Sequence, residues 1–204
     1  MTWRARLDEL DASWLDALVA GDMPAIRRRV TLACAFAACT VHTPVDEAEY
    51  QFTEYVTHGA LPDGSGLAEL KSSAILTSRE WAESLTLDEV RGWADGWAAA
   101  EAIASHVYGL AMTKASFAAA LIGYPEPYCL DTHGLQLVAS RMQASGADVI
   151  PLDRLRSRTR TWRGYHRLGE WAFGSRMHQW EYFAGTVPSF ASGGHEAYFK
   201  VALA

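Results

Sequence analysis

The sequence has few of the residues on which metal-binding, redox-active and secreted proteins depend. It contains only three cysteines, Cys34, Cys39 and Cys129, and no two of them form a CxxC pair. An odd and sparse set of this kind predicts reduced thiols and a cytoplasmic location, and it leaves too few ligands for an iron–sulfur cluster. No HExxH, P-loop or dinucleotide-binding motif is present, so we expect neither a metal nor a cofactor.

Long hydrophobic runs and strand patterns are also missing. No apolar stretch approaches the length of a membrane span, and acidic residues follow Met1 too soon for a signal peptide. Apolar residues instead recur at three- and four-residue spacing along most of the chain, and glycine and proline residues separate these segments. The sequence therefore predicts an all-α protein that does not enter a membrane.

Capping residues and helix breakers predict where the helices begin and end. Side chains of Asp and Thr accept hydrogen bonds from the first turn of a helix, and glycine readily ends one. On this basis Thr43 caps a helix that ends at His58, and Thr86 forms a capping box with Glu89. The other expected helices cover about 7–20, 23–38, 67–76, 78–85, 87–107, 113–122, 132–145 and 174–183, with a last one from His195.

The net charge is −6, but the charge is unevenly distributed. Between Arg154 and Arg176 there are seven arginines and one acidic residue, so the rest of the chain is more acidic than the total indicates. A basic block on an acidic body can dock on phosphates, and Arg158, Arg160 and Arg163 are candidate phosphate contacts. The alternative is a solvated arginine-rich loop, and this feature alone does not decide between the two.

The residues best suited to chemistry lie between Gly109 and His133. Two expected helices meet at a short turn around Gly109, and a helix N-terminus behind a tight glycine turn is an anion-binding site. We therefore expect Gly109, Ala111 and Thr113 to hold a phosphate through their backbone N–H groups.

Lys114 follows this turn and is one of only three lysines in the chain. Counting by three and four residues places it at the N-terminal end of a buried stripe with Phe117 and Leu121. Burial and the positive end of the helix dipole both disfavour an ammonium there, which suits a nucleophilic or Schiff-base lysine. The alternative is a lysine whose stem is packed and whose charged end reaches water.

Asp131 lies seventeen residues after Lys114, at the expected start of the next helix. As an N-cap it would accept backbone N–H groups and stay ionised, which suits a general base or a group that stabilises a cation. The alternative is a cap with no chemical role. His133 is either a hydrogen-bond donor near this carboxylate or a surface imidazole, and the spacing does not decide.

The segment Gly109–Lys114, together with Leu130-Asp131-x-His133, resembles the signature of the helix–hairpin–helix DNA glycosylase superfamily. In that superfamily the hairpin grips the DNA backbone, the lysine of the bifunctional members attacks the sugar, and the aspartate assists departure of the base. The resemblance implies a DNA-glycosylase-like helical fold, double-stranded DNA as the partner, and catalytic roles for Lys114 and Asp131.

A second match lies upstream, where Cys39–Asp46 resembles the segment after the first core helix of the superfamily. There the superfamily places a residue that fills the gap left by a flipped base. The resemblance puts His42 in that place, and it puts Thr40 and His133 in the pocket for the base.

These matches also predict the domain organisation. Together with the helix order they cover roughly residues 25–145. We expect a single unit of two helical lobes over 1–204, in which 25–145 form the glycosylase-like core. Residues 1–24 and 146–204 would pack as the remaining lobe.

The hairpin departs from the common pattern of the superfamily, since Ala111 replaces a second glycine and one extra residue precedes Lys114. These departures, and the sequence Cys-Leu-Asp-Thr-His around Asp131, resemble a phage-type branch that builds hypermodified thymines. In that branch an amine, from an amino acid or a polyamine, displaces pyrophosphate from 5-(pyrophosphoryloxymethyl)uracil in DNA. A His-Glu pair recurs there, so the resemblance implies that His195 and Glu196 belong to the base pocket.

Three functions remain open from the sequence. The first is a transferase that joins an amine to the flipped base, with Asp131 as the base catalyst and Lys114 stabilising the departing pyrophosphate. The second is an N-glycosylase and lyase in which Lys114 forms a Schiff base. The third is a DNA-binding domain without catalysis. We place the transferase first, because an acidic chain with an altered hairpin suits a dedicated modifying enzyme better than a genome scanner.

Overall fold

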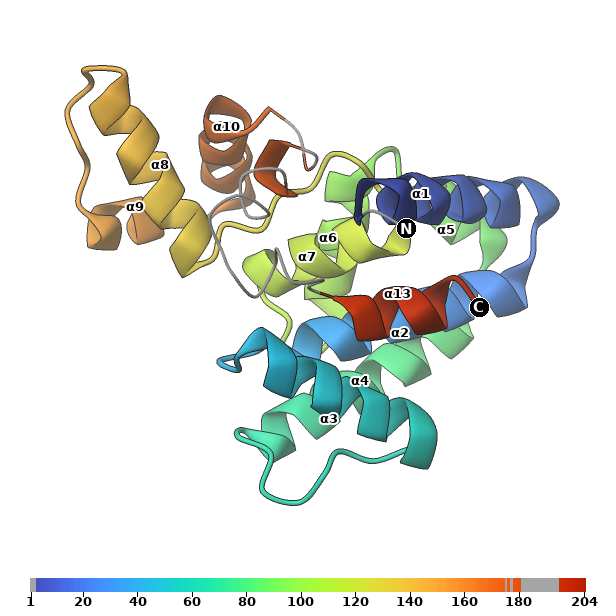
Figure 1. Ribbon diagram of the computed structural model, residues 1–204. Coiled ribbons are helices and arrows are strands. Elements are labelled where there is room, and N and C mark those ends of the chain that lie inside the picture. Colours follow the sequence, from blue (N-terminus) through green and yellow to red (C-terminus); the bar gives the residue numbers. More distant parts are fainter. Residues whose placement is uncertain (1–2, 175, 177, 181–194) are drawn as a thin grey trace.

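The computed structural model describes residues 3–174, 176, 178–180 and 195–204, and every regular element among them is a helix (Figure 1). This confirms the expected all-α class. The helices are α1 (Trp3–Ala20), α2 (Met23–Cys39), α3 (Val45–His58), α4 (Ala68–Ser84), α5 (Leu87–Arg91), α6 (Gly96–His106), α7 (Met112–Ile122), α8 (Thr132–Ala144), α9 (Leu152–Arg158), α10 (Trp162–Ala172) and α13 (Glu196–Ala202).

Polar side chains cap several helices as the sequence predicts. Asp22 caps α2, and both halves of the capping box between Thr86 and Glu89 are formed at the start of α5. Asp131 caps α8 through a hydrogen bond from the Gly134 N–H. Such caps satisfy backbone N–H groups that have no partner inside the helix, so they fix where each helix begins.

The expected Thr43 cap of α3 is wrong. Pro44 occupies the N-cap position, and no side chain caps this helix. The Thr43 hydroxyl donates to the carbonyl oxygen of Val41 and accepts a hydrogen bond from Lys71. Because this hydroxyl is already engaged with a buried lysine, it is not available to the first turn of α3.

Three expected helix spans also differ from the structure. The span 87–107 is divided into α5 and α6, because the Asp95 side chain accepts two backbone N–H groups and starts a new helix. The spans 67–76 and 78–85 form one continuous helix, α4. The Thr77 hydroxyl bonds back to carbonyl groups of the preceding turn, so it does not interrupt this helix.

The last part of the chain is helical where the structure describes it. Of the expected helix at 174–183, residues 176 and 178–180 are helical, and the rest lies largely outside the described residues. The expected closing helix is present as α13, with His195 as its N-cap residue in the left-handed region at φ 71°.

Helix α2 is the centre of the larger hydrophobic core. It is rich in alanine and buried on nearly every side, and α1, α3, α4, α7 and α13 pack around it (Figure 1). Arg29 links three of these helices, because its guanidinium donates to the carbonyl oxygens of Leu10, Ile122 and Ala202 at 3.4, 3.3 and 2.9 Å. A buried guanidinium needs such acceptors, so this residue holds α1, α7 and α13 against α2.

Helices α8, α9 and α10 form a second, smaller core with the segment that precedes them, and they lie to one side of the larger body (Figure 1). Residues 146–173 therefore pack with α8 rather than with the N-terminal helix. Helix α1 belongs to the larger core, although it also pairs with two C-terminal residues, Arg176 and Glu196.

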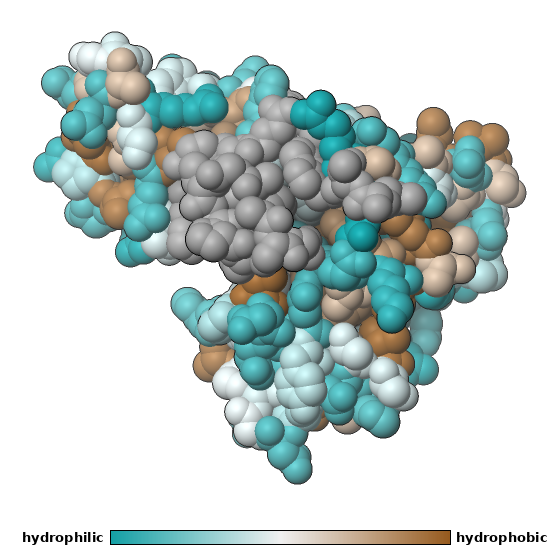
Figure 2. All heavy atoms as spheres, viewed as in Figure 1, coloured by the Kyte–Doolittle hydropathy of each residue, from teal (hydrophilic) through white to brown (hydrophobic). Residues whose placement is uncertain are grey.

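The surface in the view of Figure 2 is mostly hydrophilic, with hydrophobic residues scattered among the polar ones. None of the helices in the described ranges has both the length and the hydrophobicity that a membrane span requires.

Candidate functional site

The turn between α6 and α7 leaves backbone N–H groups open at the start of α7. Gly109 has a φ of 80°, and a Cβ at this position would lie 2.9 Å from the Leu70 Cδ1, so the turn requires glycine. Ala111 is the N-cap residue of α7 and supplies no side-chain acceptor, and both Gly109 and Ala111 are exposed. An anion can therefore approach the first turn of α7, where Thr113 lies partly exposed.

Lys114 contacts Thr40 where α7 meets the C-terminal end of α2. The Lys114 Nζ donates to the Thr40 carbonyl oxygen at 3.1 Å and to the Thr40 Oγ1 at 2.9 Å. No carboxylate among the described residues lies within ion-pair distance of this Nζ. Because an ammonium has three N–H donors, one donor is left for a ligand.

His195 is buried beside Lys114. The His195 ring lies 5.3 Å, between centroids, from both Phe36 and Phe117, and the Lys114 Nζ lies 5.7 Å from the Phe117 centroid. Burial above all, and then the charge of Lys114, lower the pKa of His195 to about 3. His195 is therefore neutral at pH 7, and it adds no second charge to the surroundings of Lys114.

A second lysine, which the sequence analysis missed, lies close to Lys114. Lys71 on α4 is 1% exposed, and its Nζ donates to the Thr43 Oγ1 at 2.6 Å and to the Gln51 Oε1 at 2.8 Å. Burial lowers the pKa of Lys71. Cys39 and Glu47 oppose this effect, and the charge of Lys114 adds a still smaller effect in the lowering direction. The available signal was a lysine whose neighbours three and four residues later are apolar.

Two side chains hold segment 128–130, which directly precedes Asp131. The Tyr165 hydroxyl donates to the Tyr128 carbonyl oxygen at 2.9 Å and accepts from the Leu130 N–H at 2.7 Å. Gln179 bonds both backbone groups of Cys129, at 2.7 and 2.8 Å. Buried backbone groups outside a helix need such partners, so Tyr165 and Gln179 fix where α8 begins. No pattern in the sequence indicated either contact.

Asp131 and Lys114 both act electrostatically on the Cys129 thiol. The pKa of the Cys129 thiol is raised to about 12, above all by burial and then by the Asp131 charge, while the Lys114 charge acts in the opposite direction. The Asp131 Oδ1 accepts from the Gly134 N–H at 2.9 Å, and no described residue binds its other carboxylate oxygen. The two charged groups therefore share a neighbour without forming an ion pair.

Three other candidates for the base pocket have different surroundings. His42 is exposed in the turn between α2 and α3, and its φ of 51° lies in the left-handed region. Glu196 pairs with Arg6, so its carboxylate is already neutralised. The side chain of His133 lies outside the described part of the structure.

The arginine-rich block is divided between two environments. Arg158, Arg160 and Arg163 are exposed on α9, α10 and the turn between them, in the smaller lobe. Arg176 is 1% exposed, and it binds both carboxylate oxygens of Asp11 at 2.9 and 2.7 Å. Arg176 therefore ties the C-terminal part of the chain to α1 and is not available to a ligand.

Within the residues that the structure describes, no three His, Cys, Asp or Glu side chains are gathered in a way that could hold a metal ion. No protein-family model, curated protein or solved structure matches the chain. The resemblance to the helix–hairpin–helix DNA glycosylases therefore stays a prediction, and the function has to be inferred from the chemistry of the site.

Proposed function

We propose that this protein is a DNA-modifying transferase. Its substrate is a thymine-derived base that has been flipped out of duplex DNA and that carries a pyrophosphate on its 5-methylene group. An amine, such as that of an amino acid, displaces the pyrophosphate. The turn between α6 and α7 acts as a helix–hairpin–helix clip on the DNA backbone, within a glycosylase-like fold.

The observation that carries this proposal is the charge of Lys114. Among the described residues its ammonium donates hydrogen bonds only to the neutral oxygens of Thr40, and a second lysine lies nearby. A partly buried positive charge without a carboxylate partner is suited to an anionic ligand. The departing pyrophosphate is such a ligand, because the Lys114 ammonium can stabilise its negative charge.

Asp131 supplies the complementary chemistry. The amine nitrogen forms a bond to the 5-methylene carbon, and the bond from that carbon to the pyrophosphate oxygen breaks with its electron pair. The nitrogen then has to lose one proton. The free carboxylate oxygen of Asp131, held in place by the α8 cap and by the contacts of Tyr165 and Gln179, accepts it.

One observation favours the glycosylase as a second candidate. The Lys114 Nζ is partly buried and no carboxylate among the described residues pairs with it, so no ion pair blocks its approach to an electrophilic sugar carbon. In that case Lys114 attacks the sugar C1′, the base leaves, and Asp131 stabilises the cationic sugar. The two reactions use the same residues, but the transferase keeps the base on the DNA and exchanges its pyrophosphate for the amine, whereas the glycosylase removes the whole base.

Mass spectrometry of reacted DNA tests the proposal. A duplex with one 5-(pyrophosphoryloxymethyl)uracil is incubated with the protein and a mixture of amino acids. We expect pyrophosphate release and a product in which one amine replaces it. Lys114→Ala and Asp131→Asn should each slow release about a hundredfold, since each removes a group that acts in the transition state. Thr40→Val removes one of the oxygens that hold Lys114 and should slow release to a smaller degree.

Lys200→Ala is the matched control, because Lys200 is exposed on α13 and should leave the rate unchanged. Loss of the base, with a Lys114–DNA adduct trapped by borohydride, would replace the transferase with the glycosylase. DNA that is bound but chemically unchanged by the native protein would leave only the DNA-binding domain.

A further inference from the structure

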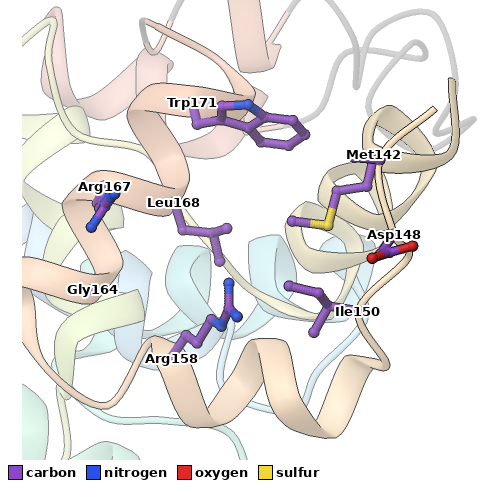
Figure 3. A pocket seen from close by; sticks show the side chains of 9 residues that line it. Met142, Asp148, Ile150, Arg158, Gly164, Arg167, Leu168 and Trp171 are labelled. Atoms are coloured by element: carbon purple, nitrogen blue, oxygen red, sulfur yellow. The ribbon is translucent and has the colours of Figure 1, made fainter. Parts of the chain in front are cut away.

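The smaller lobe contains a hollow of about 660 Å³ that is separate from Lys114 and Asp131. It lies between the C-terminal end of α8, the connection to α9, and α10 (Figure 3). Apolar side chains line most of it, and charged groups lie at its sides. The residues that matter for its chemistry are Met142, Asp148, Ile150, Arg158, Leu168 and Trp171.

Trp171 provides a flat apolar surface at this hollow. Its side chain projects from α10 over the space that Met142 and Leu168 line from opposite sides (Figure 3). Trp171 is 49% exposed, whereas Trp180, near the end of the chain, is buried in the larger core. A half-exposed tryptophan beside an apolar hollow is suited to stacking against a flat ring.

The charge around the hollow is positive and largely unpaired. The guanidinium of Arg158 points into the hollow, between Leu168 and Ile150 (Figure 3). Arg158 and the neighbouring Arg163 and Arg167 are all exposed. None of their side chains forms a hydrogen bond or ion pair with any described residue. Asp148 lies across the hollow, beyond ion-pair distance from Arg158. These arginines therefore keep their full capacity for phosphate oxygens.

The hollow lies too far from Asp131 for its ligand to be the amine co-substrate of the proposed reaction. Met142 follows Asp131 by eleven residues along α8, and at 1.5 Å per residue their Cα atoms are roughly 16 Å apart along the helix axis. An amine bound in the hollow could not reach a base held at Asp131. A DNA strand spans this distance within a few nucleotides.

We propose that the hollow binds one unpaired nucleotide of the DNA. Its base stacks on Trp171, its phosphate is held by Arg158, and the adjoining phosphates contact Arg163 and Arg167. Asp148 accepts a hydrogen bond from the exocyclic amino group of the base. The proposal rests on the proposed function for its partner, DNA, and it adds a second grip on a strand that has been opened to flip the target base.

Fluorescence anisotropy with two labelled DNAs tests this proposal. One is a fully paired duplex, and the other is the same duplex with a three-nucleotide bulge. Trp171→Ala should weaken binding of the bulged duplex roughly tenfold and leave the paired duplex within twofold, because one base–aromatic stack is lost. Arg158→Gln should weaken the binding of the bulged duplex and reduce its salt dependence. Arg79→Gln, on the exposed face of α4, is the control and should change neither.

Circular dichroism and thermal unfolding establish that each variant is folded. Equal weakening of both DNAs by Trp171→Ala, or no weakening of either, would overturn the proposal. Displacement of the bulged duplex by poly-glutamate, with the same dependence on Trp171, would assign the hollow to an acidic peptide instead. If binding of the bulged duplex depends on Trp171 but the native protein does not convert the modified base, the proposed function is wrong and the nucleotide site stands. If Trp171→Ala converts the modified base normally and binds the bulged duplex as the native protein does, only the nucleotide site is wrong.

Discussion

Lys114 and Lys71 approach the connection between α2 and α3 from two different helices. Lys114 bonds Thr40 at the start of this connection, and Lys71 bonds Thr43 near its end. The two ammonium groups therefore hold the segment that carries His42, whose backbone has a left-handed conformation. A change at either threonine should alter the position of a charge as well as the local backbone.

His195 gives a prediction at the scale of one residue. Its pKa is about 3 in the folded protein, against an ordinary value of 6.5, because burial disfavours its charged form. An unfolded chain therefore binds a proton that the folded chain does not, and stability is lost as the pH falls from 6.5 toward 3. Between pH 7.5 and 5.0 we expect this residue to cost about 2 kcal/mol of unfolding free energy.

Urea unfolding of the native protein and of His195→Asn at both pH values measures this effect. Asparagine tolerates the left-handed backbone of this position but does not titrate. The variant should lose about 2 kcal/mol less than the native protein on acidification. An identical loss in both proteins would show that His195 is protonated without cost, and that the buried site is open to water.

At the scale of elements, close contacts between helices and connections depend on a few small residues. Gly96 begins α6, and its backbone packs against Pro127 and Tyr124 of the segment between α7 and α8. A Cβ at this position would lie 2.6 Å from side-chain atoms of both neighbours. This contact fixes how the connection to α8 leaves α7, and it therefore helps to place Asp131.

We expect Gly96→Ala to lower the unfolding free energy by about 1–3 kcal/mol, because the added methyl group has no space. Gly66→Ala is the matched control, since no atom lies within 4 Å of its added Cβ. Denaturant unfolding of both variants gives the comparison. Equal stabilities would mean that α6 and the 124–127 segment can separate without cost.

At the scale of the whole molecule, two hydrophobic cores predict two units of local stability. The larger core surrounds α2 and includes Leu10, and the smaller one joins α8, α9 and α10 and includes Leu155. Both leucines are fully buried, so replacing either by alanine should cost about 2–5 kcal/mol.

Hydrogen exchange detected by mass spectrometry should distinguish the two cores. Leu155→Ala should speed exchange in α8–α10 and leave α2 and α7 nearly unchanged, because local opening follows the core that has been weakened. Leu10→Ala should speed exchange in α1, α2 and α7 instead. A uniform increase along the whole chain in both variants would mean that the two cores unfold as a single unit.

Much of the helix pattern could be read from local sequence, because caps and breakers act within a few residues. Asp22, the Thr86 capping box and Asp131 each act on the helix that directly follows. The expected Thr43 cap is wrong for a nonlocal reason, because the Thr43 hydroxyl is hydrogen-bonded by Lys71, which lies 28 residues later in the chain. The local sequence does not distinguish Trp171 from Trp180, and only tertiary packing leaves Trp171 exposed and buries Trp180.

The sequence by itself determined the all-α class, most helix boundaries and the choice of Lys114, Asp131 and Thr40 as residues to examine. These follow from hydrophobic periodicity, from side chains that bond nearby backbone groups, and from short motifs. Only the tertiary structure decided that Lys114 meets Thr40, that Lys71 lies nearby, and that Gln179 and Tyr165 position the segment before Asp131. These contacts join residues far apart in the chain, and their geometry depends on how whole helices pack.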